Sequence, residues 1–331
     1  RSDVVTLYGG GRFHLYRYKK FTDVRLVWAP EAAVAFFGGD ADNFEYPRYC
    51  LDACIFRVYE DDKPAKTEHF LKWSDQGVEI DQLVFVSGNP GRTSRILTVA
   101  ALEYQRDVRM PYILNFIRRR EVLLQQFGLK STEKKRRARD ELLGIQNARK
   151  ARTGMLQGLQ DPSFIERKRQ AEAKLLAKVK ADPALKKYAS AWQTIEKLCE
   201  REAELQGKGI SLNTALFRTA QTLVRMAAED QKPSAERLRE YRDSARESLL
   251  QQLFSPAPVY KDLEQTKLAD LIALLVELRG GDDPFVNKIL DGKSPQTRAS
   301  QLVQGTRVDE VASVSYTHLT LPTTSALCCG R

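Results

Sequence analysis

The spacing of apolar residues changes from a strand pattern to a helix pattern at residues 83–93, which read LVFVSGNPGRT. Four apolar residues of strand type lead into Gly, Asn and Pro, which favour a turn, and then into Thr93, which can cap a helix. Short runs rich in β-branched and aromatic residues precede this stretch, and apolar residues at helical spacing follow it. The sequence therefore predicts an α+β protein, with a β region over residues 1–92 and a mainly α-helical region over residues 93–312.

Upstream of this stretch, short apolar runs predict β-strands. Turn signals rich in Gly, Asp and Pro separate the runs. This spacing is typical of part of an antiparallel barrel or sandwich rather than of βαβ units. The predicted strands cover residues 4–7, 13–18, 24–28, 54–59 and 83–86.

Downstream, capping residues indicate where helices begin. Thr93 or Ser94 can cap a first helix that runs to residue 127 and bends at Pro111. Asp161 and Asp182 each precede a Pro, a pair typical of a helix start. Further helices are predicted over residues 235–254, capped by Ser234, and over residues 263–278, 284–290 and 295–303.

The composition excludes two classes of protein. Of the 331 residues, 42% are hydrophobic and 29% charged, which is enough apolar material for a core and excludes a mostly disordered chain. The sequence contains no run of 18 apolar residues, so no membrane span is expected. Of the five cysteines, Cys328 and Cys329 lie in the tail that is excluded below, and Cys50, Cys54 and Cys199 fit neither a disulfide framework nor a zinc site.

Both ends of the sequence are unusual. It begins with Arg1 rather than Met, and its composition changes abruptly after Ala312. Residues 314–324 read VSYTHLTLPTT, which is similar to a translated sequencing adapter. We therefore expect residues 313–331 to be a read-through tail that is not native, and we leave it out of the fold prediction.

The positive charge gathers in the helical region. Between residues 101 and 250 there are 32 Lys and Arg against 20 Asp and Glu, an excess of 12, whereas the whole chain carries +10. The densest part is residues 134–139, KKRRAR, with Glu133, Asp140 and Glu141 next to it. Because no aromatic spacing and no DNA-binding motif accompany it, the pattern favours a solvated helix face over a nucleic-acid site.

One loop concentrates residues that can carry chemistry, residues 36–52 with the sequence FFGGDADNFEYPRYCLD. Asp40, Asp42 and Asn43 offer oxygen donors at short spacing, as in a cation-binding loop. The Glu that closes an EF-hand loop is absent. Two interpretations stay open: a cation loop, and an ordered loop with a buried polar network.

Other motifs accompany this loop: VRLVWAPE at residues 24–31, KWS at 72–74, FVSGNPGRT at 85–93 and GTR at 305–307. Together they resemble the bacterial dipeptidyl-peptidase 7 and dipeptidyl-peptidase 11 family over residues 3–310. The resemblance implies a serine dipeptidyl-peptidase with a chymotrypsin-like double β-barrel and an inserted α-helical cap domain. Family members are longer, so the chain is expected to be an internal fragment.

The resemblance implies roles for three loop residues. Asp52 matches the catalytic aspartate, which accepts the Nδ1 proton of the catalytic histidine and stabilises the imidazolium. Asn43 matches the asparagine that binds the free α-amine of the substrate. Phe44 stands where the family often has Trp, so it can wall the amine subsite but has no indole donor. The family's histidine and serine have no match in this chain, which alone is expected to be inactive.

The resemblance also implies partners and location. The substrates would be peptides with a free N-terminus, cleaved without a cofactor or metal, in the periplasm or after secretion, and no nucleic acid would bind. A homodimer stays open. The alternative from another class is a non-enzymatic, basic helical binding protein for nucleic acid or an acidic partner, which a steep salt dependence of polyanion binding would indicate.

Overall fold

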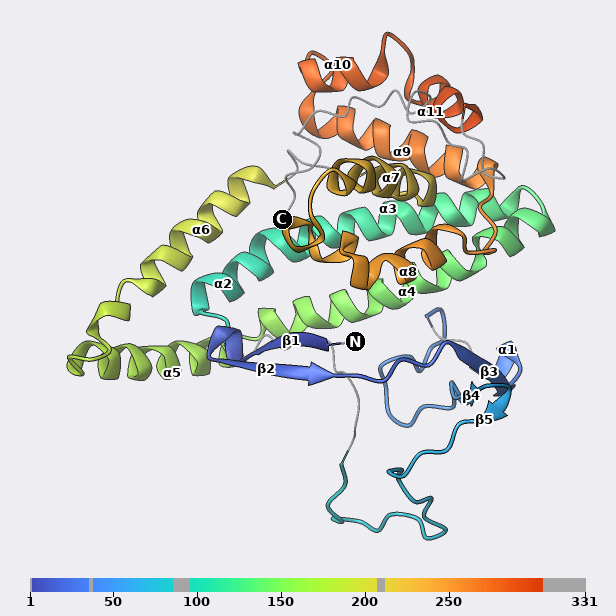
Figure 1. Cartoon of the computed structure of the whole chain (residues 1–331). Helices are drawn as coiled ribbons and strands as arrows, with labels where there is room; N and C mark the ends of the chain where they lie inside the picture. Colours follow the sequence, from blue (N-terminus) through green and yellow to red (C-terminus); the bar gives the residue numbers. More distant parts are fainter. Residues whose placement is uncertain (1, 36–37, 86–95, 207–211, 306–331) are drawn as a thin grey trace. The chain divides into compact units, whose positions relative to one another are not determined.

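The computed structural model describes residues 2–35, 38–85, 96–206 and 212–305. The chain divides into two compact units, Arg1–Leu97 and Thr98–Arg331. All described strands belong to the first unit, and all long helices belong to the second (Figure 1). The α+β class is therefore confirmed.

The first unit contains two small antiparallel sheets. One is a hairpin of β1 (Ser2–Leu7) and β2 (Arg12–Arg17). The other has the order β3-β4-β5, with β3 at Asp23–Trp28, β4 at Ile55–Glu60 and β5 at Lys63–Pro64.

The turn between β4 and β5 has the left-handed geometry of tight hairpins. Asp61 and Asp62 have φ of +50° and +59°, a conformation that Asp tolerates better than most residues. Arg25 of β3 donates to Asp62 Oδ1 at 2.8 Å and to Asp23 Oδ2 at 2.7 Å. This pairing ties the turn to the opposite edge of the sheet.

One predicted strand is wrong over its described part. Leu83–Phe85 forms no strand, and Val86 lies outside the described residues. Apolar composition alone does not make a strand, because its backbone groups need a partner strand. Among the described residues, none pairs with Leu83–Phe85.

The second unit is helical. No described helix is both long enough and apolar enough to cross a membrane. Its helices are α2 (Val99–Tyr104), α3 (Met110–Leu129), α4 (Thr132–Gln160), α5 (Pro162–Ala181), α6 (Ala191–Leu205), α7 (Ala215–Asp230), α8 (Asp243–Leu253), α9 (Lys261–Arg279), α10 (Pro284–Leu290) and α11 (Pro295–Gln304).

The start of the first long helix differs from the prediction. Thr98 caps α2 by accepting the Ala101 N–H, whereas the predicted caps Thr93 and Ser94 lie outside the described residues. A π-helical turn over Gln105–Arg109 then connects α2 to α3, immediately before Pro111. Because Pro has no N–H to donate and its ring crowds the preceding turn, a widened turn at this point accommodates it.

Two further predicted helix starts are wrong. Ser234 does not cap a helix over residues 235–254; two short 3-10 turns precede α8, and the Ser234 hydroxyl accepts the Asp243 N–H. The Glu229 carboxylate accepts the Leu238 N–H, so side chains satisfy backbone groups that a helix would otherwise pair. Asp182 caps a turn, with Ala184 as donor, and only a 3-10 turn follows it. Asp161, in contrast, caps α5 as predicted.

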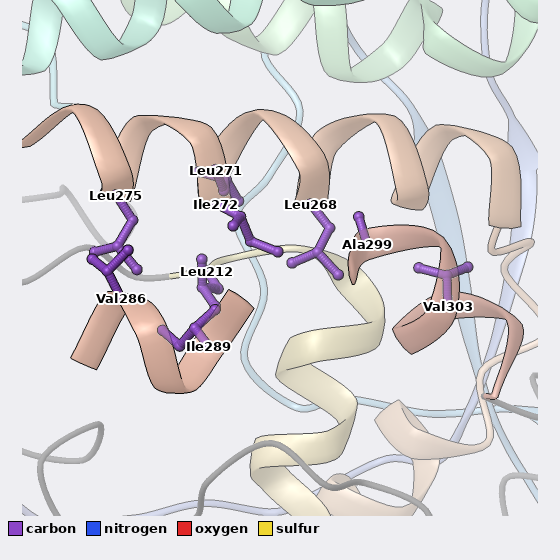
Figure 2. Packing of buried hydrophobic residues seen from close by; sticks show 9 residues of the cluster. All are labelled: Leu212, Leu268, Leu271, Ile272, Leu275, Val286, Ile289, Ala299 and Val303. Carbon is purple, nitrogen blue, oxygen red and sulfur yellow. The ribbon is translucent and has the colours of Figure 1, made fainter. Parts of the chain in front are cut away.

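The main core of this unit surrounds α9. Figure 2 shows apolar side chains of α9 facing those of α10 and α11, with Leu212 between them. A second cluster joins α3, α4 and α9 through Leu124, Phe127, Ala138 and Leu263. The predicted helices over residues 263–278, 284–290 and 295–303 are confirmed, since α9, α10 and α11 cover them.

Charged residues are buried where α3, α4 and α9 approach one another. Glu264 accepts the Leu216 N–H at 2.8 Å and pairs with Lys267 Nζ at 2.6 Å, and Lys267 also reaches Glu141 at 2.9 Å. Burial lowers the pKa of the Arg120 guanidinium, although Glu141 and other nearby carboxylates oppose this shift. This network links helices that are far apart in the sequence.

Candidate active-site loop

The loop of interest leaves the short helix α1 (Ala32–Ala35) and ends at β4. Its described part is residues 38–54, since residues 36–37 lie outside the described chain. The Leu51 N–H donates to the Val34 carbonyl at 3.0 Å, so the end of the loop returns to α1. The loop is therefore closed by backbone pairing at its base.

Two carboxylates, those of Asp40 and Asp42, make contacts with other residues of the loop. Asp40 Oδ1 accepts the Gly38 N–H at 2.6 Å, and Asp40 Oδ2 lies 3.7 Å from Arg48 Nη2. Asp42 Oδ2 accepts the Tyr49 N–H at 2.8 Å. This bond, more than any other cause, lowers the pKa of the Asp42 carboxyl. No local signal in the sequence indicates that Arg48 and Tyr49 are the partners of these carboxylates.

Asn43 and Phe44 lie at the turn that these carboxylates brace. Asn43 is buried, with 1% of its surface exposed, and its backbone N–H donates to the Asp40 carbonyl at 3.4 Å. Phe44 has φ of +64° and is exposed. Two neighbouring residues thus present one buried amide and one exposed ring.

Asp52 lies at the other end of the loop. It is exposed and occupies the irregular segment between Leu51 and β4. The same loop therefore carries all three residues to which the resemblance gives roles, Asn43 and Phe44 at its turn and Asp52 where it returns to the sheet.

The cation-loop interpretation gains no support. Within the ranges that the structure describes, no group of three or more His, Cys, Asp or Glu side chains is arranged to hold a metal ion. Asp40 and Asp42 each accept a hydrogen bond from a backbone N–H of the loop through one carboxylate oxygen. Cys50 and Cys54, which flank Asp52, form no disulfide with each other or with Cys199, the third cysteine that the structure describes.

Two arginines of the basic segment of α4 are paired with carboxylates of the helical unit. Arg136 and Arg137 both donate to Glu133, and Arg137 also pairs with Asp262 of α9 at 3.0 Å. These bonds lower the pKa of Glu133 to about 2. Arg136 and Arg137 are therefore paired with carboxylates of the same unit.

Comparison with known proteins decides the family. Residues 1–318 match the sequence profile of peptidase S46. The chain belongs to the peptidase S46 family. This confirms the resemblance to dipeptidyl-peptidases 7 and 11. The tail predicted over residues 313–331 lies outside the described residues.

Curated dipeptidyl-peptidases are similar to parts of the chain. The Asp/Glu-specific dipeptidyl-peptidase of Shewanella putrefaciens is 30% identical over 251 residues, 72% of this chain and 34% of the relative. Dipeptidyl-peptidase 7 of Porphyromonas gingivalis is 38% identical over 111 residues, 30% of this chain and 16% of the relative. The matched segments thus span about a third or less of the length of these relatives.

A solved structure of DPP11 shares the fold. DPP11 of Porphyromonas endodontalis in complex with the dipeptide Arg-Glu gives a TM-score of 0.63 at 19% identity, covering 99% of this chain and 50% of that chain. At such identity the likeness shows the fold.

Proposed function

We propose that this chain is part of a serine dipeptidyl-peptidase that releases dipeptides from the free N-terminus of peptides. The observation that carries the proposal is the peptidase S46 match over residues 1–318, which includes the 36–52 loop. Relatives named dipeptidyl-peptidase support the reaction class. The enzyme would need no cofactor, because triad chemistry uses only side chains and water.

In this proposal Asp52 is the triad aspartate. Its carboxylate would accept the Nδ1–H of the catalytic histidine, hold the ring in the reactive tautomer and stabilise the imidazolium. Asn43 would accept a hydrogen bond from the substrate ammonium through its side-chain carbonyl, and the exposed Phe44 ring would form a wall of that subsite. A substrate without a free amine would lose the bond to Asn43.

The finer architecture belongs to the same proposal. The two sheets would be parts of a chymotrypsin-like double β-barrel, with the helical unit inserted as a cap that limits access to extended peptides. The exposed apolar side chains of β3 and β4 support this, since barrel strands bury one face. The enzyme would act in the periplasm or outside the cell.

Substitution Asp52→Asn tests the reaction, with protein expressed from the complete open reading frame. Loss of the charge would leave the loop shape intact but disfavour the reactive tautomer, so kcat should fall by about 10⁴-fold. Dipeptide release would be measured on peptides with acidic and with apolar second residues, because some relatives are named Asp/Glu-specific and others are not. The exposed Asp75→Asn is the matched control and should keep full activity. Equal activity of Asp52→Asn and Asp75→Asn would refute the proposed triad.

Substitution Asn43→Ala tests the amine subsite. We expect kcat/KM for a free peptide to fall, while kcat/KM for its N-acetylated form stays near its low starting value. The ratio of the two values measures recognition of the amine. An unchanged ratio would remove Asn43 from the site and leave the Asp52 test untouched.

A further inference from the structure

Asp42 immediately precedes Asn43 in the 36–52 loop. Its carboxylate accepts the Tyr49 N–H at 2.8 Å, and its carbonyl accepts the Glu45 N–H at 3.0 Å. One residue thus connects the turn that carries Asn43 and Phe44 to the segment that returns toward Asp52. The connection spans seven residues of a loop whose described part, residues 38–54, has no regular secondary structure.

The geometry of the turn depends on such a tie. Phe44 has φ of +64°, and a bulky residue keeps this left-handed conformation only where its surroundings enforce it. Asn43 is the buried side chain in a unit whose described apolar side chains are otherwise exposed or half-buried. The described apolar side chains of this unit therefore provide no buried core for the turn, and polar contacts within the loop hold it.

We propose that Asp42 is a positioning residue, whose hydrogen bond from the Tyr49 N–H fixes Asn43 in the orientation that recognises the substrate ammonium. The inference rests on the proposed function, because it acts through Asn43. The acceptor oxygen matters here rather than the charge. A neutral acceptor of the same shape should keep the turn in place, whereas a side chain without an acceptor should release it.

The test compares Asp42→Ala with Asp42→Asn in protein from the complete open reading frame, with free and N-acetylated forms of one peptide. Asp42→Ala should lower the ratio of kcat/KM values about tenfold, mainly by raising KM for the free peptide, as loss of one hydrogen bond to a charged group predicts. Asp42→Asn should restore most of the ratio, because its Oδ1 can accept the Tyr49 N–H. Asp75→Ala serves as the control for removal of a carboxylate from the same unit.

Three results would overturn the inference. An unchanged ratio in Asp42→Ala would show that the bond does not position Asn43. An equal loss in Asp42→Asn and Asp42→Ala would show that charge, and not the acceptor, is required. If Asp42→Ala does not fold, Asp42→Glu replaces it, since the extra methylene keeps the charge but displaces the oxygen from Tyr49; an unchanged ratio there would also contradict the inference.

The outcome separates this inference from the proposed function. If Asn43→Ala abolishes discrimination and Asp42→Ala does not, only the positioning role is wrong. If Asn43→Ala leaves discrimination intact, the amine subsite itself is wrong, and the positioning role fails with it.

Discussion

The two units of the chain differ in where their apolar side chains lie. Within the described residues, every buried hydrophobic side chain falls between Val99 and Val303, in the helical unit. In the first unit, strand residues such as Leu26 and Phe56 remain 60% and 56% exposed although their strands are paired. Strand pairing satisfies part of the backbone in both sheets, but burial of apolar surface stabilises mainly the helical unit.

The role of buried polar residues also differs between the two units. In the helical unit they complete the structure: Glu264 pairs with Lys267 and accepts a helix N–H, and Thr214 caps α7. In the first unit the buried polar side chain among the described residues is Asn43, inside the 36–52 loop. Burial thus indicates a structural role in one unit, and in the other it coincides with the proposed substrate contact.

The same substitution in each unit tests this comparison and carries the largest expected effect. Leu271→Ala empties a fully buried position of α9 and should lower the free energy of unfolding by about 3 kcal/mol or more. Leu26→Ala in β3 should lower it by less than about 0.5 kcal/mol, since the side chain is 60% exposed. Urea unfolding of the 331-residue chain, followed by circular dichroism and by tryptophan fluorescence, measures both effects.

A matched control lies within the helical unit. Leu129→Ala removes the same side chain from an exposed position at the end of α3 and should behave like Leu26→Ala. A cost for Leu26→Ala close to that of Leu271→Ala would break the comparison, because it would mean that β3 buries this face in solution.

A buried carboxylate sharpens the comparison with a smaller effect. Glu264→Ala removes the acceptor of the Leu216 N–H and one partner of Lys267, so the free energy of unfolding should fall by about 2 kcal/mol. Glu264→Gln should recover part of this, since it keeps an acceptor for Leu216. Thermal unfolding followed at helical wavelengths measures the difference; equal losses in the two variants would show that the ion pair with Lys267, not the bond to Leu216, dominates.

The helices around the core could be predicted because their signals are local. Asp283 and Ser294 each cap the helix that follows them, and Pro284 and Pro295 occupy its first turn. Apolar spacing then placed α9 within two residues of its observed bounds, Lys261–Arg279. Such signals act within a few residues, so the sequence alone contains them.

The predictions that failed concern segments whose structure depends on residues outside the segment itself. The run at Leu83–Phe85 has strand composition, yet no described strand pairs with it. The helix predicted after Ser234 is interrupted because Glu229, from the preceding helix, takes the Leu238 N–H. In the loop, motif resemblance pointed to Asn43, Phe44 and Asp52, but only the coordinates reveal the bond from Tyr49 to Asp42.

An exposed group of ion pairs in the helical unit gives the smallest expected effect. It tests whether surface charges of this unit stabilise the folded state in addition to its buried core. Arg136 and Arg137 lower the pKa of Glu133 to about 2 from an ordinary value of 4.5. A lowered pKa means that the folded state binds the proton more weakly than the unfolded state, so the contribution of Glu133 is present above about pH 4.5 and is lost as the pH falls toward 2. Glu133→Gln should therefore lower the unfolding temperature slightly at pH 7. The difference in unfolding temperature from the unsubstituted chain should vanish near pH 2, and high salt should reduce it at neutral pH.

The exposed Glu200→Gln is the control and should leave the unfolding temperature unchanged at pH 7 and at pH 2. A difference that persists unchanged at pH 2 would show that Glu133 acts through its shape in the first turn of α4 and not through its charge.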